Sequence, residues 1–200
     1  LVSYFAHGWA VYGVRISLVP LFAVEALHRS AALAGLALTV FAAGNVIVLM
    51  FAGRLTDFLG RRRPMLVGLV VSGGATIWLG FTGEVPEFLA ASLIAGAGTG
   101  LITPAQGATV ADVIGSQAKG GPVLATVQMA ADVGAILGPI ATGLLADQLS
   151  YTAAFVLTGA ISLLAAAAWL RSPETRPPGD AAPALTPVSA PTRVSRGLGG

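Results

Sequence analysis

The sequence predicts an all-α integral membrane protein with six transmembrane helices. Hydrophobic residues make up 55% of the 200 residues and charged residues only 10%, whereas an ordinary soluble domain has about 25% charged residues. A water-soluble domain of this length cannot bury so much apolar surface in one core. Six separate apolar runs, and an uneven distribution of basic residues among the connections between them, support the same fold class.

Helix breakers and charged residues divide the sequence into apolar runs, each near the roughly 20 residues that one bilayer crossing requires. The runs are rich in Ala, Leu, Gly and Val and show no strict alternation, whereas a β-barrel needs alternating segments of about ten residues. We therefore expect helices. Their predicted ranges are 3–27, 31–52, 64–82, 88–114, 121–146 and 151–170.

Basic residues are concentrated on one side of the predicted spans. The opposite connections contain Arg29 as their only basic residue, together with Glu84, Glu87 and Asp147. Cytoplasmic connections carry an excess of Lys and Arg, so we predict a multi-pass protein of the cell membrane with both chain ends cytoplasmic. The basic residues of the cytoplasmic side are Arg54, Arg61, Arg62, Arg63, Lys119, Arg171 and Arg176.

The composition changes after the sixth run. Residues 172–200 hold six of the twelve prolines, many small polar residues and no hydrophobic period, so we predict a disordered cytoplasmic tail there. Residues 1–171 form the predicted transmembrane bundle. Because the chain begins with Leu rather than Met, and no signal peptide is visible, we expect a fragment of a longer protein or a misassigned start.

The composition also argues against several classes of function. A net charge of +2 gives no reason to expect a nucleic-acid partner, and the absence of cysteine excludes disulfides and thiolate metal sites. His7 and His28 lack companions at ligand spacing, so we expect neither a metal nor another cofactor. No Ser/His/Asp, His-Glu-x-x-His or paired-aspartate motif lies in the predicted helices, so we do not expect an enzyme.

Two short matches suggest an internal repeat. The segment Gly53 to Asp57 at the end of the second run is echoed by Gly143 to Asp147 at the end of the fifth, 90 residues further along. Pro20 and Pro104 occupy similar places in the first and fourth runs. Three helices followed by three helices enter the membrane from opposite sides, so the pattern predicts two inverted three-helix repeats, as in many secondary transporters.

The connection after the second run contains the strongest local motif. Gly53 permits close helix packing, Gly60 permits the positive φ of a tight turn, and Pro64 suits the first turn of a helix. Asp57 is placed to pair with Arg61 and to face helix N-termini, which attract negative charge. A generic basic loop would explain the arginines of this segment but not its Gly-Asp-Gly spacing.

The segment Gly-Arg-Leu-Thr-Asp-Phe-Leu-Gly-Arg-Arg-Arg at 53–63 closely resembles the G-x-L-a-D-x-x-G-r-r-r signature of the major facilitator superfamily. The resemblance implies two six-helix bundles around a central cavity that work by alternating access. It makes Asp57 a latch between conformations, although Phe58 stands where many members have a basic residue. The implied conformational-switch loop consists of Gly53, Asp57, Gly60, Arg61 and Arg62.

Two features indicate which half of such a transporter the chain represents. Members usually carry an arginine in the fourth helix of the first half, and residues 91–100 contain none. The Ser-Pro-Glu-Thr-Arg sequence at 172–176 resembles the C-terminal ends of many members. Both favour the C-terminal half.

The segment Gly134-x-x-x-Gly138-Pro139 resembles an antiporter motif usually found in the fifth helix, although the eleventh helix often carries a relative of it. The glycines permit close packing and Pro139 permits a bend.

Arg15 and Asp132 are the charges placed most clearly inside the hydrocarbon, where a charge costs at least a few kcal/mol. Both lie about a dozen residues into runs that begin on the cytoplasmic side, so we expect similar depths and a possible ion pair, with Gln128 one turn from Asp132. Substrate binding or proton coupling and a purely structural pair are equally good interpretations. Gln106 and Asn45 are candidates to line the pathway or to bridge helices.

The sequence thus predicts a secondary active transporter of a small solute working by alternating access, with proton-coupled efflux as one option. The alternative is a non-transporting membrane component, either a remnant half or a partner-binding subunit. The expected partners are the lipid bilayer, a small-molecule substrate, and either the missing six-helix half or a second copy of the chain. The substrate, the direction of transport and the coupling ion are not predicted, because in this family both halves line the cavity.

Overall fold

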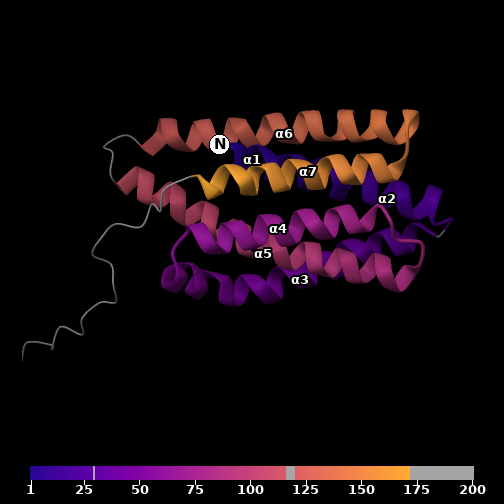
Figure 1. Cartoon of the computed structure of the whole chain (residues 1–200), viewed down its shortest axis with the longest axis horizontal. Helices are drawn as coiled ribbons and strands as arrows, with labels where there is room; N and C mark the ends of the chain where they lie inside the picture. Colours follow the sequence, from indigo (N-terminus) through magenta and orange to yellow (C-terminus); the bar gives the residue numbers. More distant parts are fainter. Residues whose placement is uncertain (29, 116–119, 172–200) are drawn as a thin grey trace, which may run out of the picture.

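The computed structural model describes residues 1–28, 30–115 and 120–171, with the side chain of Asp57 left out. Within this part of the chain the structure is entirely helical and forms a bundle of long helices lying side by side (Figure 1). The predicted tail at 172–200 lies outside the described residues. So do Arg29, Lys119 and Arg176, which contributed to the predicted orientation.

The first rod of the bundle is assembled from four consecutive helical pieces: α1 (Val2–Gly8), the π-helical η1 (Trp9–Leu18), α2 (Val19–Leu21) and the π-helical η2 (Phe22–Ala26). Pro20, which has no N–H to donate, lies between the two π-helical stretches. We refer to Val2–Ala26 as rod 1. The remaining helices are α3 (Ala31–Leu59), α4 (Arg62–Leu79), α5 (Val85–Gly115), α6 (Gly120–Gln148) and α7 (Tyr151–Leu170).

All six predicted helices are present, and one boundary differs appreciably. The second was expected to end at residue 52, whereas α3 continues to Leu59. The chain then turns at Gly60, whose φ of 82° confirms the predicted positive value. The motif therefore begins inside the helix, because residues 53–59 contain no proline and nothing in them forces the helix to stop earlier.

Within the described residues, five helices have the length and apolar composition needed to cross a membrane: Val2–Ala26, Ala31–Thr56, Val85–Gly115, Gly120–Gln148 and Tyr151–Leu170. The sixth, α4, has 18 residues and begins with Arg62 and Arg63, which lower its mean hydropathy. It lies between α5 and α7 (Figure 1), so much of its surface meets protein rather than lipid.

The helices pack in a regular order. Rod 1 packs on α6 and α7, whereas α5 packs on α3 and α4, and α4 and α7 join the two sets at the centre. One core cluster is aromatic: Phe22 contacts Phe88, Tyr151 and Phe155, with ring centroids 5.2–5.8 Å apart. The outer helices α3 and α6 leave many large apolar side chains exposed.

Glycines allow the closest helix contacts. On the rod 1–α6 crossing, an added Cβ at Gly134 would overlap the Phe5 carbonyl oxygen, and one at Gly8 would overlap the Ala131 carbonyl oxygen. On the α3–α5 crossing, an added Cβ at Gly96 would overlap the Phe41 carbonyl oxygen. These helices approach with backbone against backbone, as small residues permit inside membranes.

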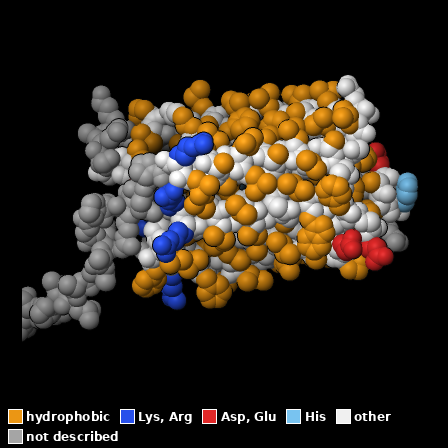
Figure 2. Space-filling view, viewed as in Figure 1, with side chains coloured by type: hydrophobic (Ala, Val, Ile, Leu, Met, Phe, Trp, Pro, Cys, Tyr) orange, Lys and Arg blue, Asp and Glu red, His pale blue; other side chains and the backbone are white. Residues whose placement is uncertain are grey.

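Charged side chains gather at the two ends of the bundle. On the face shown in Figure 2, the Lys and Arg side chains lie at the end where α4 begins, and the Asp and Glu side chains lie at the opposite end. Hydrophobic side chains cover the length between them. This distribution suits a bundle whose sides contact lipid and whose ends contact water.

Two glycines of α6 test whether the close crossing stabilises the fold. We predict that Gly134→Ala lowers the free energy of unfolding by about 1–3 kcal/mol, because the new methyl group must push rod 1 away. Gly143→Ala is the matched control, since nothing lies within 4 Å of its added Cβ, and it should leave stability unchanged or slightly raised. Thermal unfolding of the purified variants measures both. Equal effects at the two positions would contradict the role of the crossing.

Candidate functional site

A polar cavity of about 250 Å³ lies where rod 1, α5 and α6 meet. We call it the polar cavity. Three of the polar side chains that line it were singled out from the sequence, namely Gln106, Gln128 and Asp132, and His7 lies with them. The full lining consists of Tyr4, His7, Gly8, Val11, Tyr12, Gln106, Gln128, Ala131 and Asp132.

The carboxylate of Asp132 is exposed and oriented by its own helix. Gln128, one turn earlier on α6, donates from Nε2 to Asp132 Oδ1 over 2.8 Å. An i, i+4 pair of this kind fixes the carboxylate without neutralising it. Asp132 therefore offers a negative charge and free acceptor positions on the surface of an apolar bundle, which suits a cation or a proton.

Arg15 is placed quite differently from Asp132. Its side chain is only 5% exposed, and its guanidinium carbon lies 3.9 Å from the centroid of the Phe41 ring of α3. A desolvated cation–π contact of this kind is worth about 2 kcal/mol. Arg15 also borders a very small internal pocket together with Ser72 and Thr99, so polar groups surround part of the charge.

Arg15 and Asp132 do not pair, and the prediction that they share a depth is wrong. On the rod 1–α6 crossing, Gly8 faces Ala131 and Gly13 faces Gly138, so Asp132 lies near the level of Gly8. Arg15 is about two helical turns further along rod 1, roughly 10 Å in axial rise. The prediction counted depth from the first residue of each helix. The start of α6 projects past the start of α1 (Figure 1), so equal counts along the two helices do not give equal depths.

Gln106 and Asn45 occupy different environments. Gln106 is 5% exposed, and its Nε2 atom is buried with no hydrogen-bond partner among the described residues. Asn45 lies on α3 at the crossing with α5, where its backbone carbonyl faces Gly100. It is not among the residues that line the polar cavity, so the structure groups Gln106 with Asp132 and leaves Asn45 apart.

His7 is a cavity residue that the sequence interpretation did not select. It was considered only as a metal ligand, and within the described residues no three His, Cys, Asp or Glu side chains gather at a possible metal site. The available signal was its position, because a histidine in the interior of an apolar run and one turn from Tyr4 shares a helix face with that tyrosine. The crossing with α6 brings this face to Asp132.

The loop motif forms a set of charged contacts between helices. Arg61 donates to Asp112 at the end of α5 over 3.1 Å and 3.4 Å, and to the Thr56 carbonyl over 3.4 Å. Arg62 donates to the carbonyl of Leu170 at the end of α7. The side chain of Asp57, the predicted latch, lies outside the described part of the structure. Asp112 was not among the predicted site residues, and its ion pair with Arg61 adds it to the contacts of the motif.

The Gly134-x-x-x-Gly138-Pro139 segment packs against rod 1. Both glycines are buried and face its backbone. Thr142, one turn after Gly138, donates to the carbonyls of Gly138 over 2.8 Å and of Gly13 over 3.2 Å. The segment thus places α6, and with it Asp132, against the first rod.

The family model described as Major Facilitator Superfamily matches residues 1–196. Multidrug resistance protein 2 of Bacillus subtilis is 29% identical over 154 residues, which cover 77% of this chain and 38% of the relative. Multidrug resistance protein 1 of the same species is 30% identical over 171 residues, covering 82% and 42%. A multi-drug resistance efflux pump PmrA homolog of Lactococcus lactis is 26% identical over 126 residues, covering 63% and 31%.

These matches agree with the helical bundle and its apolar sides. The chain spans less than half the length of these curated relatives, whereas the family model covers nearly all of the chain. A multi-pass membrane bundle, a matching family model and similar relatives therefore lead to one conclusion: this chain belongs to the Major Facilitator Superfamily of membrane transporters.

Proposed function

We propose that the chain is the C-terminal six-helix half of a secondary transporter that exports a small solute by alternating access. The observation that carries the proposal is the polar cavity, where the exposed carboxylate of Asp132 lies with Gln128, Gln106 and His7. An ionisable group in a membrane bundle is costly and marks substrate or ion pathways. Relatives named for multidrug resistance support export.

The exposed surfaces of α3 and α6 support the presence of a second bundle. Asp132 is exposed on α6, and facing lipid it would cost several kcal/mol. A second six-helix half, or a second copy of the chain, would cover this carboxylate and complete the cavity.

The order of helix packing supports the inverted repeat. If rod 1, α6 and α7 correspond to α5, α3 and α4, each contact in one set has a counterpart in the other. Rod 1 packs on α6 as α5 packs on α3, and both of these crossings are made close by glycines. Because this correspondence exchanges α4 and α7, the contact between these two helices is its own counterpart. We infer two inverted three-helix repeats, which is the arrangement of many secondary transporters.

We propose that the segment from Gly53 to Arg62 is the conformational switch, with Asp57 as its latch. The contacts of Arg61 with Asp112 and of Arg62 with Leu170 join the start of α4 to the ends of α5 and α7 at one end of the bundle. A change of conformation that moves these ends must break or rearrange such contacts. Arg15 and Asn45 remain candidate pathway residues within the same proposal.

The basic end of the bundle is proposed to face the cytoplasm, with both chain ends and the tail at 172–200 on that side. Arg63 lies in the first turn of α4, Gly83 lies in the connection that follows the other end of this helix, and both residues are exposed. Because the chain has no cysteine, we predict that Gly83→Cys reacts with an impermeant maleimide in intact cells, whereas Arg63→Cys reacts only after permeabilisation. The reverse pattern would show the opposite orientation.

Two aspartates are predicted to be essential for transport. Asp57→Asn and Asp132→Asn should each reduce export of the cationic dye ethidium by the complete transporter at least about tenfold, because each removes a charge assigned to the mechanism. Asp147→Asn, an exposed position at the end of α6, is the matched control and should retain export. Membrane abundance of each variant is measured alongside. Normal export by either of the first two variants would remove that residue from the mechanism.

The half-transporter proposal predicts that the chain alone does not transport. Reconstituted into liposomes as a proven monomer, it should give no saturable ethidium flux, and flux should return when a first six-helix half is supplied. Saturable flux from the monomer would contradict the proposal. Failure of flux with a correctly assembled first half would instead favour the alternative, a non-transporting membrane component.

A further inference from the structure

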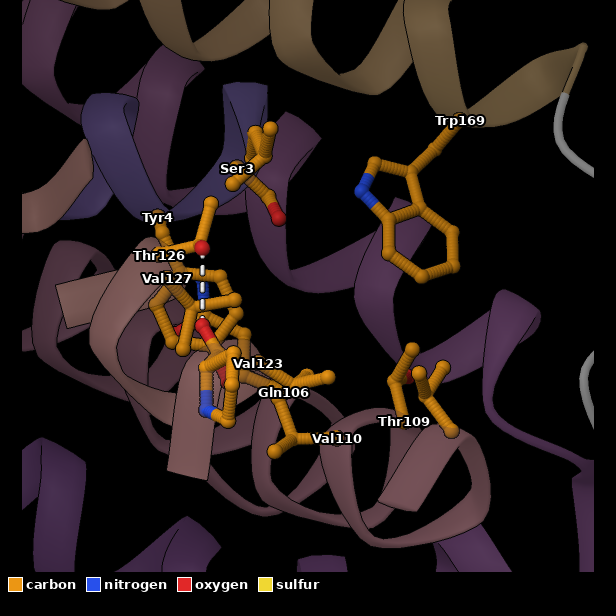
Figure 3. Close-up of a pocket in the computed structure, with 12 residues that line it drawn as sticks. Ser3, Tyr4, Gln106, Thr109, Val110, Val123, Thr126, Val127 and Trp169 are labelled. Carbon is orange, nitrogen blue, oxygen red and sulfur yellow. Dashed lines mark hydrogen bonds between the residues drawn. The ribbon is translucent and has the colours of Figure 1, made fainter. Parts of the chain in front are cut away.

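A second cavity, of about 380 Å³, lies on the other side of Gln106 and Tyr4 from the polar cavity. We call it the apolar cavity. It is bounded by the start of α1, the second half of α5, the start of α6 and the end of α7, from which Trp169 points inward (Figure 3). Its size falls within the range of cavities that hold small organic molecules.

The lining of the apolar cavity defines the chemistry of a ligand. Val110, Val123 and Val127 supply aliphatic surface, while Tyr4 and Trp169 supply aromatic rings. No charged side chain is among the described residues that line it, so a charged ligand would lose its hydration without gaining a partner. The lining therefore favours an uncharged, largely aromatic molecule.

Gln106 supplies a specific polar contact. Its side chain lines the apolar cavity, and its Nε2 atom is buried without a hydrogen-bond partner in the described part of the chain. A buried donor left unpaired is costly. A turn of this side chain toward the cavity would let a ligand oxygen accept a hydrogen bond from the amide, and no described residue does so.

We propose that the apolar cavity is a binding site for an uncharged aromatic molecule with a carbonyl oxygen, held between Tyr4 and Trp169 with its oxygen accepting a hydrogen bond from Gln106. The site goes beyond the proposed transport, because it is bounded by helices of this chain and includes α7, which does not line the polar cavity. It is distinct from the polar cavity of Asp132, and its occupancy requires neither a second bundle nor transport activity.

Photolabelling of the purified chain with benzophenone tests the proposal. Benzophenone is an uncharged aromatic ketone that, under near-ultraviolet light, forms bonds with nearby C–H groups. We expect saturable labelling concentrated on peptides that contain Val123, Val127 and Trp169, as mapped by mass spectrometry. Val123→Trp, which fills the cavity, should reduce this labelling at least about fivefold. Val67→Trp is the matched control, because Val67 is exposed on an apolar groove of α4 and α7.

A second variant keeps the test decisive if Val123→Trp disturbs the fold. Gln106→Leu preserves side-chain size and removes the amide, so the half-saturating concentration of benzophenone should rise about fivefold, the effect of one neutral hydrogen bond. Labelling that does not saturate, or that spreads equally to the groove around Val67, would show nonspecific or lipid-like association and overturn the proposal. Saturable labelling unchanged in Gln106→Leu would overturn the assigned contact. Because no step measures transport, failure here leaves the proposed transport function untouched.

Discussion

Contact between helix backbones at glycine positions is the constraint on which the rest of this structure depends. In a membrane, lipid is as apolar as the helix surfaces, so helices associate through close packing rather than through a hydrophobic driving force. Gly134 lies against the backbone of Phe5, and Gly8 against that of Ala131. These contacts fix both the separation and the axial register of rod 1 and α6. The register in turn brings His7 to Asp132.

The polar groups of the bundle are positioned by the same contacts. Hydroxyl side chains fill the spaces that remain between closely packed helices: Thr142 bonds to the Gly13 carbonyl, and Trp9 donates its indole N–H to Thr158 over 3.1 Å. Such bonds satisfy polar atoms that lipid could not. Gln106 is an exception, because its amide nitrogen is buried between two cavities and has no partner among the described residues.

The sequence was sufficient to predict the helices but not which helices pack against each other. Helix positions follow from the thickness of the bilayer, which sets the length of each apolar run, and Gly60 was predicted to turn with positive φ because few other residues do so. The pair of Arg61 with Asp112 joins residues 51 positions apart and depends on how α4 and α5 pack. The level of Asp132 likewise depends on the register of a crossing, which no local pattern specifies.

The different surroundings of Arg15 and Asp132 favour different roles, although the sequence alone led to the same two interpretations for both residues. Arg15 is enclosed by helices of its own bundle and lies over Phe41, so the described bundle already provides a partner for its charge. Asp132 is exposed, and Gln128 orients it without neutralising it. Because only Asp132 of the two still requires a partner from outside the bundle, the proposed substrate, proton or second half would interact with this carboxylate. The guanidinium of Arg15 lies over Phe41 and so joins rod 1 to α3, the helix that leads into the proposed switch loop.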